Sequence, residues 1–480
     1  QHTALALSRV LPGHIPTSYL FRYVRITRSN QPFQLYKVLR SGGVTISWVQ
    51  SLAMECWEAV DANIVLMVLQ LLPDLPALTI YIGPASLAPE HLDELLTIPR
   101  PNLRYLSLRF KPYVDKPSYD QFLRGAYFDS ALTALAKWPA CDLPSLSIVQ
   151  DPMDPKAVHQ RAFAQPLVFL GLDVNLSVLA SSDYLSTVTA LRLRIPGRQV
   201  TQPLTAHPWS LPSIDLLDLS TCNILESDVD ALLQHFVTLR YLILDECAVF
   251  HGELRGGEWE ALGKRCALAG VRRAAERELT LRIWLEANST AHRDAALKRA
   301  NQKFSRKIKR GRHGLASSYV SIRQEIETTL PVGPAEWLSS GKRLRVLPPW
   351  PTLRSITISS CRVRPDTVPA VRAEFEAGWT EGLAQLEVRR ATLRKWRAAG
   401  TSIILCFKDA DDAATDSEDD DDGENYEDGL QGLAFISSQD DFALRHVPCP
   451  VLCLAGADRH GNHVEGCGHE IAWDIWKDGL

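Results

Sequence analysis

The sequence predicts an α/β solenoid in which short parallel strands line a concave face and helices lie outside it. Three observations support this: an apolar frame recurs every 21 to 26 residues, prolines precede it, and helical apolar spacing separates its copies. Hydrophobic residues make up 46% of the 480 residues and charged residues 22%, so most of the chain can bury a core.

The recurring frame is L-x-x-L-x-L-x-x-C/N, the pattern of a leucine-rich repeat. Its alternating apolar residues predict a strand with one buried face, and the ninth residue is expected to bond the backbone of the following turn. Complete copies are Leu167, Leu170, Leu172 and Asn175; Ile214, Leu217, Leu219 and Cys222; Leu239, Leu242, Leu244 and Cys247; and Leu353, Ile356, Ile358 and Cys361. Copies without the ninth residue are Val49, Leu52 and Met54; Leu103, Leu106 and Leu108; and Val188, Leu191 and Leu193. Residues 75–82 and 143–149 predict two more strands, each compatible with two registers.

Prolines and helical segments separate the strands. Pro101, Pro212 and Pro351 stand two places before the frame, where proline prevents a helix from continuing. Residues 227–236 carry apolar residues at helical spacing, as do residues 369–399. One strand and one helix per repeat stack into a curved solenoid with a parallel sheet inside.

Charge divides the chain further. Residues 251–323 hold 17 Lys or Arg against 7 Asp or Glu, whereas residues 409–428 hold 12 acidic residues and no basic ones. We expect a basic helical insertion and a disordered acidic linker, because the linker has nothing apolar to offset its ordering entropy. The predicted domains are an F-box-like helical end and junction at 1–45, repeats at 46–250, the basic insertion at 251–345, a further repeat and amphipathic helix at 346–400, the acidic linker at 409–428, and a C-terminal tail at 429–480 that docks back on the solenoid.

The N-terminal segment carries a family pattern. Its residues are Ser8, Arg9, Pro16, Leu20, Phe21, Arg22 and Val24, then a helical stretch at 31–39 and Trp48 and Val49 at the first repeat. This segment resembles the end of an F-box and its junction to leucine-rich repeats in fungal F-box proteins. The resemblance implies a substrate-recognition subunit of a cullin–RING (SCF-type) ubiquitin ligase, with a protein substrate on the repeats. It also implies adaptor and cullin partners if the F-box is complete upstream, bound near Leu5, Leu7 and Leu11.

The alternative is a leucine-rich-repeat interaction scaffold without a ligase role. No Walker loop, dinucleotide-binding glycine motif or nucleophile elbow is present, so we expect no enzyme, no catalytic residue and no cofactor. The net charge of −4 gives no general case for nucleic acid, and no apolar run has the ~20 residues of a membrane span. Ten cysteines are too few for a disulfide scaffold, so a reducing compartment, cytoplasmic or nuclear, is expected.

Partner binding is expected on the concave face. Places three, five and seven of the frame point there because side chains alternate along a strand. The predicted partner-binding residues are Tyr105, Arg109, Arg192, Arg194, Asp218, Tyr241 and Asp245. Tyr and Arg are frequent hot-spot types at interfaces.

Two further segments have open roles. The basic run around Lys307 fits a solvated helix or one that neutralises the acidic linker, and its alternatives are nucleic-acid or phosphoprotein binding and nuclear localisation. The tail holds six thiol or imidazole donors within 21 residues: Cys449, Cys453, His460, His463, Cys467 and His469. Their spacing matches no familiar zinc finger, so the sequence prediction is that they bind no metal.

Overall fold

A computed structural model describes residue 10 and residues 17–41, 46–57, 60–83, 87, 89–98, 100–111, 129–138, 141–151, 169, 171–207, 210–249, 257–309, 343–359, 363–408, 432–436, 446–456, 458 and 461–476. The adaptor-site candidates Leu5, Leu7 and Leu11, the acidic linker, and His460 lie outside these residues. The chain divides into two compact units: residues 1–262, 352–377 and 448–480 form one, and residues 263–351 and 378–447 form the other.

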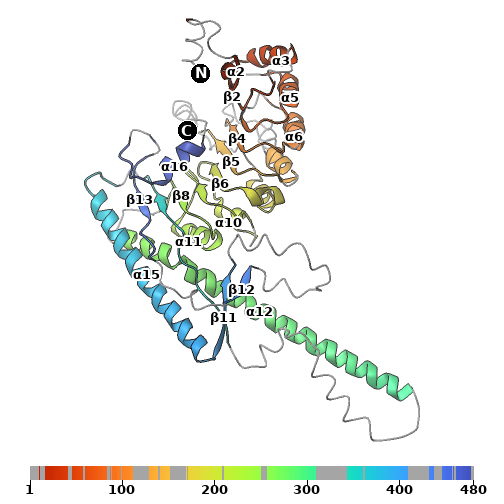
Figure 1. The fold of residues 1–480 in the computed structure, drawn as a ribbon, viewed down its shortest axis with the longest axis vertical. Helices are drawn as coiled ribbons and strands as arrows, with labels where there is room; N and C mark the ends of the chain where they lie inside the picture. Colours follow the sequence, from red (N-terminus) through yellow and green to blue (C-terminus); the bar gives the residue numbers. More distant parts are fainter. Residues whose placement is uncertain are drawn as a thin grey trace, which may run out of the picture. The chain divides into compact units, whose positions relative to one another are not determined.

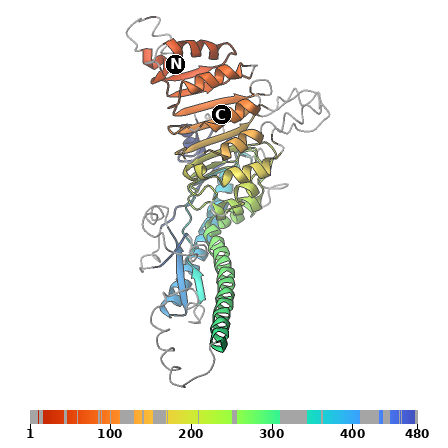
Figure 2. The same ribbon diagram turned by 90° about the vertical axis from the view of Figure 1, so that its right-hand side faces the viewer.

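The first unit contains a ten-stranded sheet in which every neighbouring pair is parallel. Its strands, in spatial order, are β1 (Tyr23–Ile26), β2 (Ser51–Met54), β3 (Ala77–Ile82), β4 (Tyr105–Phe110), β5 (Ser145–Gln150), β6 (Ala190–Arg194), β7 (Leu216–Asp218), β8 (Tyr241–Ile243), β10 (Ser355–Thr357) and β13 (Val451–Cys453). The strands stack largely in chain order (Figure 2), as expected when each repeat contributes one strand. The predicted leucine-rich-repeat solenoid is confirmed.

A ladder of aliphatic side chains explains the stacking. The fourth place of the frame pairs across the sheet through Leu52, Leu78, Leu106, Leu146, Leu191, Leu217, Leu242, Ile356 and Leu452. Each of these side chains is at most 4% exposed. Their contacts form a continuous core that no single repeat could bury alone.

Helices cover the ladder on one side of the sheet (Figure 1). They are α3 (Gln31–Ser41), α5 (Ala62–Gln70), α6 (Pro89–Thr97), α9 (Leu172–Ala180), α10 (Thr201–Leu204) and α11 (Glu226–His235), with a 3-10 helix at Asp183–Thr187 and a short α2 (Thr17–Phe21) before β1. Helix α5 shows why a boundary falls where it does, since Asp61 Oδ1 accepts from the amides of Asn63 and Ile64. An acceptor there satisfies amides that have no partner inside the helix.

One predicted copy of the frame is wrong. Residues 172–180 form helix α9, not the end of a strand. Leu172, Leu176 and Leu179 are buried at spacings of four and three, which suits a helix face, and the L-x-x-L half of the frame fits either structure. The ninth-place cysteines bond backbone, but in the preceding repeat and not in the following turn: Cys222 Sγ donates to the Leu193 carbonyl of β6, and Cys247 Sγ donates to that of Leu219, just after β7. Cys361 lies outside the described residues.

The second unit has its own small sheet, ordered β12 (Leu433–Phe435), β11 (Ser402–Phe407) and β9 (Arg343–Val346). Helices α12 (Glu258–Lys309) and α15 (Val368–Ala398) each begin in the first unit and continue into the second. Ala274 and Leu281 of α12 share a core with Val346, Leu405 and Leu433. Helix α12 covers residues 258–309 of the basic insertion, which the sequence predicted to be helical. None of the described helices combines the length and apolar composition needed to cross a bilayer.

Candidate functional site on the concave face

The concave face is the side of the ten-stranded sheet opposite the helices α3 to α11. One row along it runs through Thr79, Ser107, Ser147, Arg192, Asp218, Ile243, Thr357 and Cys453. All eight side chains are buried. A row of buried, largely polar residues on a face without the outer helices indicates that something else covers it.

The cover is α16 (Gly468–Ile475), which follows β13 and lies on this face (Figure 1). Ala472 and Trp476 pack in one cluster with Ala77, Tyr105, Ala190, Leu216 and Ile243. Gly468 lets the start of the helix approach closely, because a Cβ there would lie 3.1 Å from both Ile243 Cγ1 and Thr357 Oγ1. The C-terminal segment 448–476 thus docks on the solenoid, as the sequence predicted for the tail.

Trp476 makes the central contact of this cover. Its ring lies 4.8 Å from the Arg192 guanidinium carbon and 6.5 Å from the ring centroid of Tyr105. Arg192 also donates from Nε to Ser147 Oγ at 2.8 Å. A desolvated guanidinium over an indole is a favourable cation–π pair, so Arg192 contributes to holding the chain's own C-terminal segment.

Arg194 and Asp218 form a second fixed element. Arg194 donates from Nη2 and Nε to Asp218 Oδ2 at 2.7 and 3.0 Å, and Ser220 Oγ donates to Asp218 Oδ1 at 2.6 Å. Burial alone would raise the pKa of the Asp218 carboxyl, but the guanidinium of Arg194 and these hydrogen bonds lower it below its ordinary value.

Of the seven predicted partner-binding residues, Tyr105, Arg192, Asp218 and Asp245 are buried. Arg109, Arg194 and Tyr241 keep partial exposure. The structure gathers all seven on the concave face, while their role in partner binding remains a prediction.

A more accessible group lies at the carboxyl ends of the N-terminal strands. We call Trp57, Tyr81, Arg109 and Lys111 the aromatic–basic patch. Tyr81 lies 4.6 Å from Trp57 between ring centroids, with Arg109 5.0 Å above Tyr81 and Lys111 5.6 Å above Trp57. Three of the four side chains are half-buried and Lys111 is exposed.

Asp151 fixes the patch from the next strand. It forms an ion pair with Arg109, which also donates to Tyr81 Oη at 2.8 Å. Burial alone would lower the pKa of Arg109, but Asp151 raises it above its ordinary value, so the Arg109 guanidinium stays charged. Of its members the sequence singled out only Arg109. Trp57 and Lys111 stand at the ninth place of the frame, which is not among the places predicted to point to the concave face, and Tyr81 lies in a segment with two possible registers.

An open hollow of 480 Å³ lies at the amino ends of β1 to β5. Residues at or just before the strand starts, such as Tyr23, Ser51 and Arg104, line this hollow together with Asp474 and Ile475 of α16. Its shape therefore depends on α16 remaining docked.

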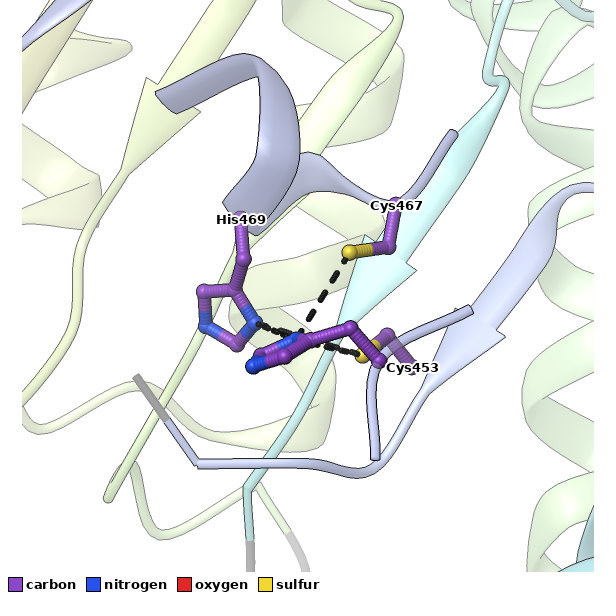
Figure 3. A group of neighbouring side chains, drawn as sticks. Cys453, Cys467 and His469 are labelled. Carbon is purple, nitrogen blue, oxygen red and sulfur yellow. Dashed lines mark hydrogen bonds between the residues drawn. The ribbon is translucent and has the colours of Figure 1, made fainter. Parts of the chain in front are cut away.

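The cysteine and histidine residues of the tail come together beside α16. Cys453 ends β13, Cys467 precedes α16 and His469 lies in its first turn (Figure 3). With His463 they place two sulfurs and two imidazole nitrogens within 4.8 Å of one another, a set that could hold a metal ion. Cys449 is not part of this group, since its described sulfur contact is with the Pro450 carbonyl.

Hydrogen bonds within this group shift the pKa values of Cys453, Cys467 and His469. The hydrogen bond between the two thiols raises the pKa of Cys453 and lowers that of Cys467. Burial alone would lower the pKa of His469, but hydrogen bonds with Asp245 and Cys467 raise it to about 9.

Comparisons with known proteins are sparse. No protein-family model and no curated protein matches the chain. Among solved structures, the leucine-rich repeat-containing protein LegL7 from Legionella pneumophila matches 51% of this chain and 71% of its own, at 15% identity and a TM-score of 0.30.

Proposed function

We propose that the protein is a non-catalytic receptor that binds a protein partner through its leucine-rich repeats. The observation that supports this most is the aromatic–basic patch. Trp, Tyr and Arg are the residue types that dominate binding energy at protein interfaces. Here they lie together on one side of a rigid parallel sheet, which holds them in place before a partner arrives.

The patch favours a partner with acidic and apolar side chains. Lys111 supplies positive charge beside the Arg109–Asp151 ion pair, and the rings of Trp57 and Tyr81 supply flat apolar area. Among the described residues, α16 packs on the central strands of the face, and the patch at the carboxyl ends of the N-terminal strands keeps partial exposure.

We further propose that the receptor serves a cullin–RING ubiquitin ligase. The support is the F-box-like pattern before the first repeat, in which Leu20 and Phe21 fall in α2 and Val24 in β1. The ligase adaptor would bind on the N-terminal side of this junction. Ubiquitin transfer would then be accelerated by holding the substrate near the conjugating enzyme, not by chemistry within this chain.

The test uses the full-length protein, tagged and purified from its own cell type, with companions quantified by mass spectrometry. The variant combines Trp57→Ala and Lys111→Ala, which change the half-buried indole and the exposed ammonium group of the patch. Val174→Ala is the control, since Val174 is 70% exposed on the outer helix α9. We expect the patch variant to lose its substrate proteins about tenfold or more, equivalent to about 1.4 kcal/mol, and the control to retain them.

Adaptor and cullin subunits separate the two versions of the proposal. The ligase version expects them with wild type and with the patch variant alike, because they bind before the repeats. Their absence, together with a partner that the patch variant loses, would refute the ligase role and leave the interaction scaffold. Companions that are unchanged in the patch variant would refute binding through the patch.

A further inference from the structure

The four converging side chains of the C-terminal segment come from three places in the chain. Cys453 is the last residue of β13, His463 lies in the following loop, and Cys467 and His469 bracket the start of α16. Cys453, Cys467 and His469 are at most 2% exposed, and His463 is half-buried. Buried thiols and imidazoles that face one another need a partner for their lone pairs.

The distances suit four ligands around one ion. The two Nδ1 atoms of His463 and His469 lie 3.3 Å apart. Cys453 Sγ lies 3.8 and 3.9 Å from these nitrogens, and Cys467 Sγ lies 3.8 Å from His463 Nδ1. Tetrahedral zinc with ordinary bond lengths would separate two nitrogens by about 3.3 Å and a nitrogen from a sulfur by about 3.6 Å.

The outer nitrogens of both rings have oxygen acceptors. His463 Nε2 lies 2.7 Å from the Asp458 carbonyl, and His469 Nε2 lies 2.5 Å from Asp245 Oδ2. An N–H at Nε2 in each ring leaves both Nδ1 lone pairs turned inward. Metal-binding histidines are oriented in this way, by a carbonyl or a carboxylate behind the ring.

Backbone amides also approach both sulfurs. Backbone amides of Ala455 and Val464 hydrogen-bond the Cys453 sulfur, and that of Glu470 hydrogen-bonds the Cys467 sulfur. Amide donors stabilise negative charge on sulfur. Trp473 closes the outside, with its ring stacked on His469 at 6.0 Å and edge-on to His463 at 4.7 Å between centroids.

We propose that Cys453, His463, Cys467 and His469 bind one zinc ion that fixes α16 to the concave face. Two thiolates and two imidazoles in tetrahedral array are the ligands of zinc, and four protein ligands leave no open position, so the site is structural and not catalytic. Asp245 is a positioning residue that joins the site to the turn after β8, and its other oxygen accepts from the Ser359 amide at 3.0 Å. The ion would thus tie together β13, the loop and α16, and Asp245 would anchor them to the turn after β8.

The first measurement is the metal content of the reduced full-length protein, purified without chelator. We expect about one equivalent of zinc, and the same value for Cys449→Ser, whose sulfur lies outside the group. Cys453→Ser and His469→Ala should each retain less than a fifth of an equivalent. Less than a tenth of an equivalent in wild type, with no uptake of added Zn²⁺ by the reduced protein, would overturn the proposal.

Wild-type protein gives a second test that does not depend on variants folding. Replacement by Co²⁺ should produce visible absorption bands of a tetrahedral site with thiolate charge transfer, lost on adding excess Zn²⁺. Thiol counting after denaturation should give all ten cysteines. A count of eight in freshly purified protein, from a Cys453–Cys467 disulfide, would instead show that the sulfurs pair with each other and exclude the zinc site.

Chelation tests the stated role. Removing the ion should raise amide hydrogen exchange across residues 461–476 at least tenfold while β4 to β6 keep their protection. Zinc that can be removed with no change in this segment would refute the anchoring role.

Discussion

Replacing Trp476 by alanine should release the C-terminal end of α16 from the concave face. Trp476 is 2% exposed, so its side chain removes about 200 Å² from water, and a buried Trp→Ala change costs about 3–5 kcal/mol. The lost contact with Arg192, 4.8 Å from the ring, accounts for about 2 kcal/mol of this.

Hydrogen exchange read by mass spectrometry measures the effect where it occurs. At 1.4 kcal/mol per tenfold, a loss of about 4 kcal/mol raises the amide exchange rate of residues 471–476 by about a thousandfold. If the free energy that docks α16 is smaller than this, exchange rises only to the unprotected rate. Strands β4 and β6 should change little, because their ladder side chains face the outer helices. Val174→Ala is the matched control on an exposed helix face. Unchanged exchange in 471–476, or an equal rise throughout the sheet, would refute the view that α16 is a separately docked cover.

Two further predictions concern the stability of the first unit. Asp61→Ala should lower the free energy of unfolding by about 1 kcal/mol in urea titration, because the first amides of α5 lose their acceptor; Asp173→Ala, whose side chain makes no described cap bond, should cost less. Asp218 has a lowered pKa in the folded state, so its stabilisation is complete above the ordinary carboxyl pKa of about 4 and is lost as pH falls through the folded value. Asp218→Asn should therefore destabilise the protein at pH 7 and flatten the acid limb of the stability curve; an acid limb identical to wild type would contradict this.

Local patterns made the repeats predictable. Each strand carries its own frame, so Leu106 or Leu217 signals burial without knowledge of the rest of the chain. The frame failed at Leu172 because an apolar pair three residues apart fits a helix as well as a strand. It also missed β13, where Cys449 and Pro450 stand at the first two places and about 90 residues separate the strand from β10.

Long-range contacts were beyond the sequence pattern. Asp245 and His469 are 224 positions apart in the sequence but form a contact, and the residues around each one give no sign of that contact. The spacing of Cys453, His463, Cys467 and His469 resembled no known finger because part of the site's support comes from the sheet and not from a compact finger. The prediction that these residues bind no metal and the zinc site proposed from their geometry are therefore in direct conflict, and metal analysis decides between them.

The covered face also changes how the repeat sequence is understood. Five of the strands hold apolar or aromatic residues at the third place of the frame, namely Ala77, Tyr105, Ala190, Leu216 and Tyr241, although three others hold Ser51, Ser145 and Ser355. These five are more apolar than a solvated sheet face requires. Parallel strands with both faces buried show this composition, so the sequence carried a signal that a further element lies on the concave side. A partner must then either bind beside α16, where the aromatic–basic patch lies, or displace it. The proposed zinc ion would resist displacement of α16 from the sheet. We therefore expect the partner protein to bind beside α16, at the aromatic–basic patch. Helix α16 would then also shape the hollow at the amino ends of the same strands.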